Sequence, residues 1–381
     1  MNRMLNIGRL YAESDADSAK LCADIEIKNS PDDITVYQMW YEVEKQYEAY
    51  LCTERADAFV AAVLLYAMER GYDISSETVV TDKLLFQLTN FFIPVVSKNI
   101  DSYKEISITA ETCSDELKCE GKVGTGVSGG VDSFYTLLKN LNSGKSKFKI
   151  THGTFLNVGA APTKELHEER LKSARNIAKE LQIELVVVNS NMNGFLGDEF
   201  VKNHTFRSCS AILAIQKLFS VYYYSSGISI ADFQLNGEST AYFDLLNLMC
   251  LSTRNTAFYS YGGEAARGEK INYISNFPIA QKYLNVCVVS EENCNQCFKC
   301  VRTMLELYAE DVLDKYGDVF DIQFFHQNKK WYLINCVRNI NQDLNLKETY
   351  LKLKKKKQIP LSVMIVGTVK RWRANILALL K

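Results

Sequence analysis

Four cysteines in one short segment are the first residues whose spacing indicates chemistry. Residues 287–300 read CVVSEENCNQCFKC, so Cys287 stands upstream of a C-x2-C-x2-C core made of Cys294, Cys297 and Cys300. Four thiolates form closed tetrahedral zinc sites, which are structural because no position is left open for water. Thiolates also hold iron–sulfur clusters, but the ferredoxin-like continuation x3-C-P is missing. The sequence therefore predicts a structural metal ion at these cysteines, with zinc favoured over iron.

A glycine-rich segment, residues 121–133, reads GKVGTGVSGGVDS. Gly124, Gly126 and Gly129 match G-x-G-x-x-G, the fingerprint of dinucleotide-binding folds. Such folds also need an acidic residue at the end of the second strand, where it binds the ribose. The second expected strand ends FLN at residues 155–157, without that acid. A Walker A loop is excluded as well, because its Gly-Lys-Ser/Thr ending does not follow the glycines.

The hexapeptide SGGVDS, residues 128–133, lies between an expected strand and an expected helix. Its glycines let backbone N–H groups approach phosphates, its two hydroxyls add donors, and the helix N-terminus supplies positive potential. Asp132 would repel a bare phosphate, but a carboxylate at this point can hold Mg²⁺. The segment therefore predicts a site for the phosphates of ATP with Mg²⁺, formed by Ser128, Gly129, Gly130, Val131, Asp132 and Ser133.

The sequence SGG-x-DS between a strand and a helix resembles the PP-loop of the N-type ATP pyrophosphatases. This superfamily includes GMP synthetase, NAD synthetase, asparagine synthetase and tRNA sulfurtransferases. The resemblance implies an α/β fold with a parallel, doubly wound sheet. It implies ATP and Mg²⁺ as cofactors, and catalytic roles for Asp132 and Ser133.

Further site residues follow from the same resemblance, in chain order. Relatives bring the tail of the second strand to the adenine, which here places Phe155 and Asn157 at the nucleotide. Arg207, in the segment HTFR, corresponds to an arginine-bearing helix start and is expected to meet a phosphate or a substrate carboxylate in catalysis. Arg267 and Lys270 resemble late cations that contact the ATP phosphates, and Lys270 is also expected to be catalytic.

The glycine loop together with the cysteine cluster, which ends C-x2-C-x-Arg, resembles one branch most: the cyano-deazaguanine synthases of queuosine synthesis. The resemblance covers residues 119–305, about half of the chain. It implies a ligase that adenylates a carboxylate and lets ammonia attack it. The short 287–294 spacing, a long N-terminal region and a basic C-terminal region depart from that pattern, so the acceptor stays open. Similar proteins of bacterial anti-phage loci, which modify macromolecules, are an alternative.

Two further classes compete with this interpretation. A tRNA sulfurtransferase needs a sulfur-relaying thiol, and Cys209 is the candidate, although a cysteine on an apolar helix is more often a small core residue. A non-catalytic nucleotide sensor would keep the same loop. No glutaminase is recognisable, since residue 2 is Asn2, so we expect free ammonia, a partner's amine or a protein amine as the nucleophile.

The elements that must position these residues alternate in type. Strands are expected at 122–127, 149–157 and 183–189, and helices at 133–141, 163–181 and 207–224. Strands separated by helices of this length indicate βαβ units and a parallel sheet. We expect an accessory α+β domain at 1–118, the ATP-binding domain with the cysteine site at 119–305, and a mainly helical, basic region at 306–381.

Composition limits the class of protein. The chain has 381 residues, 47% of them hydrophobic, and a net charge of −1, so no overall field favours nucleic acid or membrane. No apolar run approaches the ~20 residues of a membrane span. Residues 1–18 do not read as a secretory signal. Eleven cysteines, an odd number, then favour reduced thiols in a cytosol. We expect a cytoplasmic protein.

Residues 347–381 carry ten Lys/Arg against one acid, including the cluster Lys354–Lys357 and the group Lys370–Arg373. Such runs can contact phosphates of nucleic acid, but they are more often solvated helix faces. We therefore expect the acceptor to be a small acid or base, or a protein terminus, in preference to tRNA. The oligomeric state is left open.

Overall fold

The computed structural model describes residues 3–30, 33–143, 146–160 and 163–379. Five parallel strands form the half of its main sheet that carries the glycine-rich segment. They are β9 (Lys122–Gly126), β10 (His152–Asn157), β11 (Glu184–Ser190), β12 (Phe219–Ser225) and β13 (Ala257–Tyr261). Their order across the sheet is β13-β12-β9-β10-β11, and every neighbouring pair is parallel. The predicted α/β class is confirmed.

The strands that follow β9 in the chain are added first on one side of β9 and then on the other. From β9 it passes to β10 and β11, and it comes back to place β12 and β13 beyond β9, an order compatible with a doubly wound fold. The connecting helices are α4 (Val131–Leu141), α5 (Lys164–Glu180), α6 (Met192–Leu196), α7 (Phe200–Leu213) and α8 (Asp244–Leu251). Where strand order reverses, the loops that follow neighbouring strands diverge and leave a crevice for ligands. Here that point lies between β9 and β12.

One predicted element is wrong. The helix expected at 207–224 ends at Leu213, and the second half of that segment is strand β12, with the sequence FSVYYYS. Aromatic and β-branched residues favour strands, and β12 pairs with both β9 and β13. Pairing on both edges provides hydrogen-bond partners for the backbone N–H and C=O groups of this buried segment. The apolar side chains alone do not distinguish such a strand from a buried helix.

The N-terminal region extends the same sheet. Strand β4 (Asp33–Glu44) pairs antiparallel with β11, and the order continues β4-β3-β1-β5-β7 with β2 beside β3. The bounds are β1 (Met4–Ile7), β2 (Tyr11–Ser14), β3 (Ser18–Ser30), β5 (Asp73–Ser76) and β7 (Ile108–Thr109); β6 (Val80–Thr81) and β8 (Thr112–Cys113) form a separate pair. Helices α1 (Asp57–Arg70), α2 (Asp82–Gln87) and α3 (Ile93–Asn99) accompany them. Residues before and after 118 thus share one sheet.

They also share one hydrophobic core, in which Tyr41 and Phe59 pack with Phe206 and Leu213. A second core lies under the C-terminal helices, where Met304 and Leu333 join Phe134 of α4 and other side chains. These helices are α9 (Arg267–Ile274), α10 (Pro278–Tyr283), α11 (Phe298–Ala309), α12 (Ile322–Gln327), α13 (Lys329–Asn339), α14 (Leu344–Lys355) and α15 (Leu361–Leu379).

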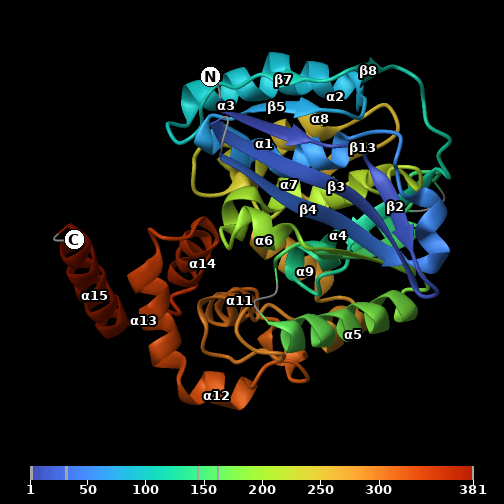
Figure 1. The fold of residues 1–381 in the computed structure, drawn as a ribbon. Coiled ribbons are helices and arrows are strands. Elements are labelled where there is room, and N and C mark those ends of the chain that lie inside the picture. Colours follow the sequence, from blue (N-terminus) through green and yellow to red (C-terminus); the bar gives the residue numbers. More distant parts are fainter. Residues whose placement is uncertain (1–2, 31–32, 144–145, 161–162, 380–381) are drawn as a thin grey trace.

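The last helices lie to one side of the sheet, and α15 stands at the edge of the molecule beside α13 (Figure 1). The expectation of a helical C-terminal region agrees with these bounds. No helix among the described residues combines the length and apolar character that a membrane crossing requires.

Candidate functional site

A cleft of about 740 Å³ opens at the carboxyl ends of β9, β10 and β12, at the point where strand order reverses. The glycine-rich loop forms one wall, and the residues after β10 form another. The segment around the first cysteine and the first turn of α11 close the opposite side. Segments far apart in the sequence therefore meet where parallel sheets place their ligands.

The glycine loop holds its shape through its own serines. Ser133 Oγ donates to the carbonyl of Gly126 at 2.7 Å and accepts the N–H of Ser128 at 3.2 Å, while Ser128 Oγ accepts the N–H of Gly130 at 3.3 Å. Gly129 has φ of 72°, a conformation that favours glycine. The hydroxyl proton of Ser133, expected to serve a ligand, is thus already used by Gly126. The hydroxyl proton of Ser128 stays available to a ligand.

The backbone of the same loop also suits an anion. Helix α4 starts at Val131, directly after Gly130, and its first N–H groups have no acceptor within the helix. They face the carboxyl end of the sheet together with the positive end of the helix dipole. The loop is anchored from outside, because the N–H of Asn285 donates to the carbonyl of Gly129 at 2.9 Å.

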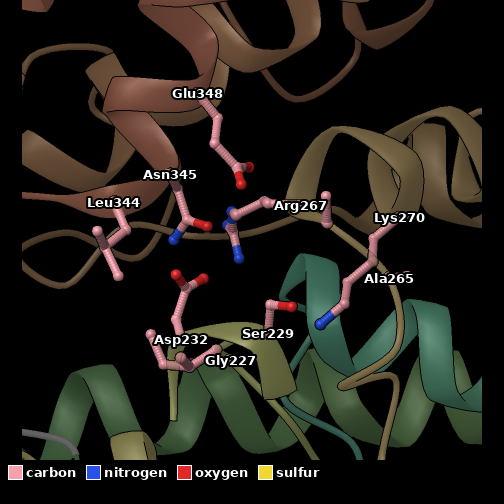
Figure 2. A pocket seen from close by; sticks show the side chains of 11 residues that line it. Gly227, Ser229, Asp232, Ala265, Arg267, Lys270, Leu344, Asn345 and Glu348 are labelled. Atoms are coloured by element: carbon pink, nitrogen blue, oxygen red, sulfur yellow. The ribbon is translucent and has the colours of Figure 1, made fainter. Parts of the chain in front are cut away.

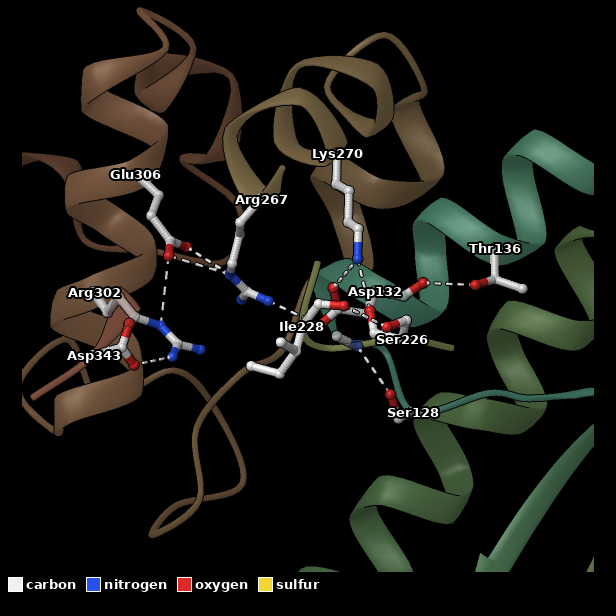
Figure 3. Close-up of polar contacts among 11 residues, drawn as sticks. Ser128, Asp132, Thr136, Ser226, Ile228, Arg267, Lys270, Arg302, Glu306 and Asp343 are labelled. Carbon is white, nitrogen blue, oxygen red and sulfur yellow. Dashed lines mark hydrogen bonds and ion pairs between the residues drawn. The ribbon is translucent and has the colours of Figure 1, made fainter. Parts of the chain in front are cut away.

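Asp132, Arg267 and Lys270, three of the predicted site residues, meet in one cluster (Figure 3). One carboxylate oxygen of Asp132 lies 2.8 Å from Arg267 Nη1, and the other lies 3.0 Å from Lys270 Nζ. Lys270 also donates to the carbonyl of Ser226 at 2.6 Å. Burial raises the pKa of Asp132, but the two cations outweigh this effect and hold the pKa below its usual 3.8.

The cluster continues through residues that the sequence reasoning missed. Arg267 Nε donates to Glu306 at 3.0 and 3.2 Å, and Glu306 is also within 3.5 Å of Arg302. Arg302 donates in turn to Asp343 at 2.6 Å (Figure 3). Glu306 is only 2% exposed. Its position one helical turn after Arg302 was the available signal, since charges four residues apart pair on a helix.

A very small pocket lies on the other side of Arg267, with a volume of about 10 Å³. Asp232, Asn345 and Glu348 converge on it from the loop after β12 and from α14 (Figure 2). This is about the space of one water molecule. The pocket can hold solvent beside the arginine, but it cannot hold a nucleotide.

Phe155 and Asn157 line the main cleft, as the resemblance implied. The ring of Phe155 lies 5.2 Å from the ring of His167, and Asn157 Nδ2 donates to Asn189 at 3.3 Å. Apolar and aromatic surface with amide groups at its edge suits a planar ring that also forms hydrogen bonds.

Arg207 does not reach the cleft, which corrects the expectation that it meets a phosphate. It is fully buried in α7, and its guanidinium donates to the carbonyls of Val158 and Gly197 and to the side chains of Asn193 and Asn203, at 2.6–3.2 Å. Burial lowers the pKa of Arg207 to about 10, although the charge of Asp198 offsets part of this effect. This arginine therefore ties together the loops behind the cleft.

The four cysteines converge as the sequence predicted. Their sulfurs lie within 4.8 Å of one another, with Cys287 and Cys297 3.9 Å apart and Cys294 and Cys300 4.0 Å apart. A tetrahedron with Zn–S bonds of ~2.3 Å has sulfur–sulfur edges of about 3.8 Å, so the arrangement fits such an ion. These residues can hold a metal ion such as zinc. Arg170 joins the site to the cleft by donating to the Cys287 carbonyl at 3.0 Å.

The cleft is lined by more cations than anions. Its lining includes four cations, Arg170, Arg267, Lys299 and Arg302. Among the described residues, the one carboxylate in this lining is that of Asp132. A concave site with this excess of positive charge concentrates anions. A polyphosphate is the type of ligand that such a lining favours.

The C-terminal basic cluster Lys354–Lys357 lies at the end of α14, away from the cleft lining. Cations at a helix C-terminus stabilise the helix dipole, and Lys356 also bonds Asp311 at 2.5 Å. Of the four lysines, Lys356 thus takes part in the packing of α14.

No family model matches the chain, and no match was found among curated proteins or solved structures. Function is therefore inferred from the chemistry of the site.

Proposed function

We propose that this protein is an ATP-dependent adenylating enzyme of the PP-loop type, which splits ATP into AMP and pyrophosphate. It would activate a carboxylate or carbonyl oxygen of an acceptor for attack by ammonia or an amine, as a ligase that forms C–N bonds. One observation carries the proposal: a cleft at the reversal of strand order holds a glycine loop that opens a helix and is lined by four cations against one carboxylate.

In the proposed reaction, an acceptor oxygen bonds to the α-phosphorus of ATP while the bond from that phosphorus to the pyrophosphate oxygen breaks. Pyrophosphate leaves with the electron pair, so negative charge grows on it. Loop N–H groups and Arg267, which line the cleft, would stabilise this charge. Lys270 lies outside the cleft lining and would act through its ion pair with Asp132. The amine then attacks the acyl carbon, AMP leaves, and the nitrogen releases its extra proton to solvent.

Two metals belong to the proposal. Asp132 would hold Mg²⁺, which supplies positive charge to the phosphates. Its carboxylate is 23% exposed and faces the cleft, but both of its oxygens are paired with cations, so one of these ion pairs must loosen when the nucleotide enters. The cysteine site would hold zinc in a structural role, because four thiolates complete its coordination.

The acceptor is proposed to be a small acid or base, or a protein terminus, because the basic cluster Lys354–Lys357 lies away from the cleft. Binding of tRNA that is tighter than micromolar and weakens steeply with salt in a shift assay would reverse this preference. Sulfur transfer is less favoured. Cys209 is fully buried in α7, and burial raises the pKa of its thiol well above the usual value. A thiol relay needs an accessible thiolate.

The test compares nucleotide binding and pyrophosphate release. Wild-type protein should bind Mg·ATP in calorimetry and release pyrophosphate when an acceptor is present. Asp132→Asn should keep the fold and lose Mg²⁺-dependent release. Asp82→Asn is the matched control, because Asp82 also pairs with an arginine, Arg254, at 2.7 Å but lies outside the cleft lining. No binding at millimolar Mg·ATP would refute the proposal, and binding without release would favour a nucleotide sensor.

A further inference from the structure

Helix α15 carries a row of exposed apolar side chains along one face. Four of them recur at intervals of four, three and four residues, which keeps them on one side of a helix. They are Ile365, Val369, Trp372 and Ile376, and their exposed fractions lie between 45% and 65%. Leu361 continues the row at the start of the helix. Contiguous apolar surface of this kind marks a place where another surface binds.

The opposite face of α15 is already packed on α13. Gly367 approaches α13 so closely that a Cβ atom there would lie 2.6 Å from the Cβ of Val337. Val363, one turn earlier on the same face, is buried, and Arg371 donates to the carbonyl of Val337 at 3.4 Å. The helix is therefore held by one face, and the exposed row is directed away from the rest of the protein at the edge of the molecule (Figure 1).

The spacing of the row is that of a coiled-coil seam. Apolar residues at alternating intervals of four and three occupy the a and d positions of heptads, whereas a helix that faces a core carries a wider apolar stripe. Here Val369 and Ile376 take the a positions, and Ile365 and Trp372 take the d positions. The row thus has the pattern of a helix whose partner is a second helix.

The row is complementary to itself when two copies run antiparallel. A twofold axis beside residues 370 and 371 brings Trp372 against Val369 of the second copy, and Ile365 against Ile376 of the second copy. Each large indole then faces a small side chain, which lets the layers interdigitate. A parallel pair would instead bring the two Trp372 rings together. A surface that fits its own copy in this way forms a closed, twofold-symmetric interface.

The residues that border the seam distinguish a second helix from a lipid surface. They are Val366 and Thr368 on the first turns and Arg373 and Asn375 on the later turns. In an antiparallel pair Arg373 lies beside Val366 of the second copy, so no like charges meet. A helix that lies on an anionic membrane carries cations along the borders of its apolar face. With one cation among four border residues, α15 fits its own copy better.

The area is sufficient for a dimer. Together with Val366, the exposed apolar side chains of the row present on the order of 600 Å² per chain, so two copies would bury about 1,200 Å², the lower end of the range for specific interfaces. We propose that this protein forms a twofold-symmetric dimer through the antiparallel pairing of α15 from two copies. The dimer does not depend on the chemistry of the cleft.

The test is sedimentation equilibrium on the full chain. At about 50 μM the protein should show twice the mass of one chain, with a dissociation constant of roughly 1–10 μM for an interface of this size. Trp372→Glu puts a carboxylate into both central layers and should weaken association at least about a hundredfold. Phe86→Glu is the matched control, because Phe86 is an aromatic residue 56% exposed on α2, away from α15 (Figure 1). It should leave the association unchanged. Equal circular dichroism and metal content would show that both variants fold.

A pair of variants tests the direction of the helices. Val366→Glu places a carboxylate beside Arg373 of the second copy, and Val366→Lys places an ammonium there. The glutamate variant should therefore associate about tenfold more tightly than the lysine variant, and added salt should reduce the difference. A parallel pair would bring residue 366 beside Leu361 of the second copy. Equal affinities of the two variants would then overturn the antiparallel seam.

The remaining outcomes also decide the proposal. A dimer that is unaffected by Trp372→Glu would show that another surface pairs, and a monomer at about 100 μM would exclude a dimer of this strength. A monomer that floats with phosphatidylserine vesicles would assign the apolar row to lipid. Each of these results would overturn pairing through α15, and none of them would change the Mg·ATP binding that tests adenylation.

Discussion

Replacing Glu306 with glutamine tests whether the buried ion-pair chain holds the cleft together. Three cations (Lys270, Arg267, Arg302) and three carboxylates (Asp132, Glu306, Asp343) form one connected, neutral cluster. Glu306 stands at its centre, 2% exposed, between two arginines. Glu306→Gln keeps the shape of the side chain but leaves three cations against two carboxylates in a buried place.

Removing one partner of a buried charge pair costs about 3–5 kcal/mol, mainly because the other charge stays buried without compensation. Both arginines keep one carboxylate, Asp132 at 2.8 Å and Asp343 at 2.6 Å, so we expect the lower end, about 3 kcal/mol. Glu264→Gln is the matched control. Glu264 pairs with Lys139 at 2.5 Å, but its side chain is 55% exposed, and such pairs contribute at most about 1 kcal/mol.

The assay is urea unfolding with linear extrapolation, read by circular dichroism, with m-values compared among variants. The double variant Glu306→Gln/Arg302→Gln should lose less unfolding free energy than the two single variants lose together, because it also removes one of the uncompensated cations. Mg·ATP affinity should fall in the single variant as Arg267 shifts toward Asp132. A loss for Glu306→Gln no larger than that for Glu264→Gln, or strictly additive losses in the double variant, would refute the reasoning.

Three further outcomes are expected. Burial raises the pKa of Asp244 to about 7 from its usual 3.8, so the folded state keeps a proton that the unfolded chain releases, and stability should fall as the pH rises from about 4 to 7. Asp244→Asn should abolish this fall, and a thermal midpoint with the same pH dependence in both proteins would contradict it. Arg207→Met leaves buried carbonyl acceptors unpaired and should cost about 3 kcal/mol in urea unfolding, whereas Lys202→Met, on the same helix and 40% exposed at its side chain, should cost less than about 1 kcal/mol. Purified protein should carry about one zinc per chain, and a strong chelator should lower the thermal midpoint and release four reactive thiols, so a stable metal-free protein would argue against the site.

Features formed by adjacent residues could be predicted from the sequence. The cysteine cluster spans residues 287–300, and its geometry depends mainly on one loop and the start of α11. The glycine loop likewise joins β9 directly to α4, so its position at the end of a strand follows from the two elements beside it. In both cases the local chain order already determines which groups face one another.

Features that depend on distant contacts could not be predicted in this way. The sequence places Arg207 in a helix near the third strand, but it does not show that the helix turns the arginine toward the carbonyls of Val158 and Gly197. The prediction of a helix over β12 is wrong because this segment pairs on both edges with β9 and β13, which are distant in sequence. Glu306 pairs with Arg267, which lies 39 residues earlier, and no local sequence pattern predicts that contact.

Two contacts to backbone carbonyls join the cysteine segment to its neighbours, one to the glycine loop and one to α5. Asn285, two residues before Cys287, donates its N–H to the carbonyl of Gly129, and Arg170 donates to the carbonyl of Cys287 from across the cleft. Helix α11, which starts directly after Cys297, carries Arg302 and Glu306 toward the charged cluster. A metal bound by the four thiolates would therefore affect the cleft only by fixing the positions of the loop before Cys287 and of α11. At a temperature where the metal-free protein stays folded, Mg·ATP affinity should still fall, because the loop that anchors Gly129 is no longer held.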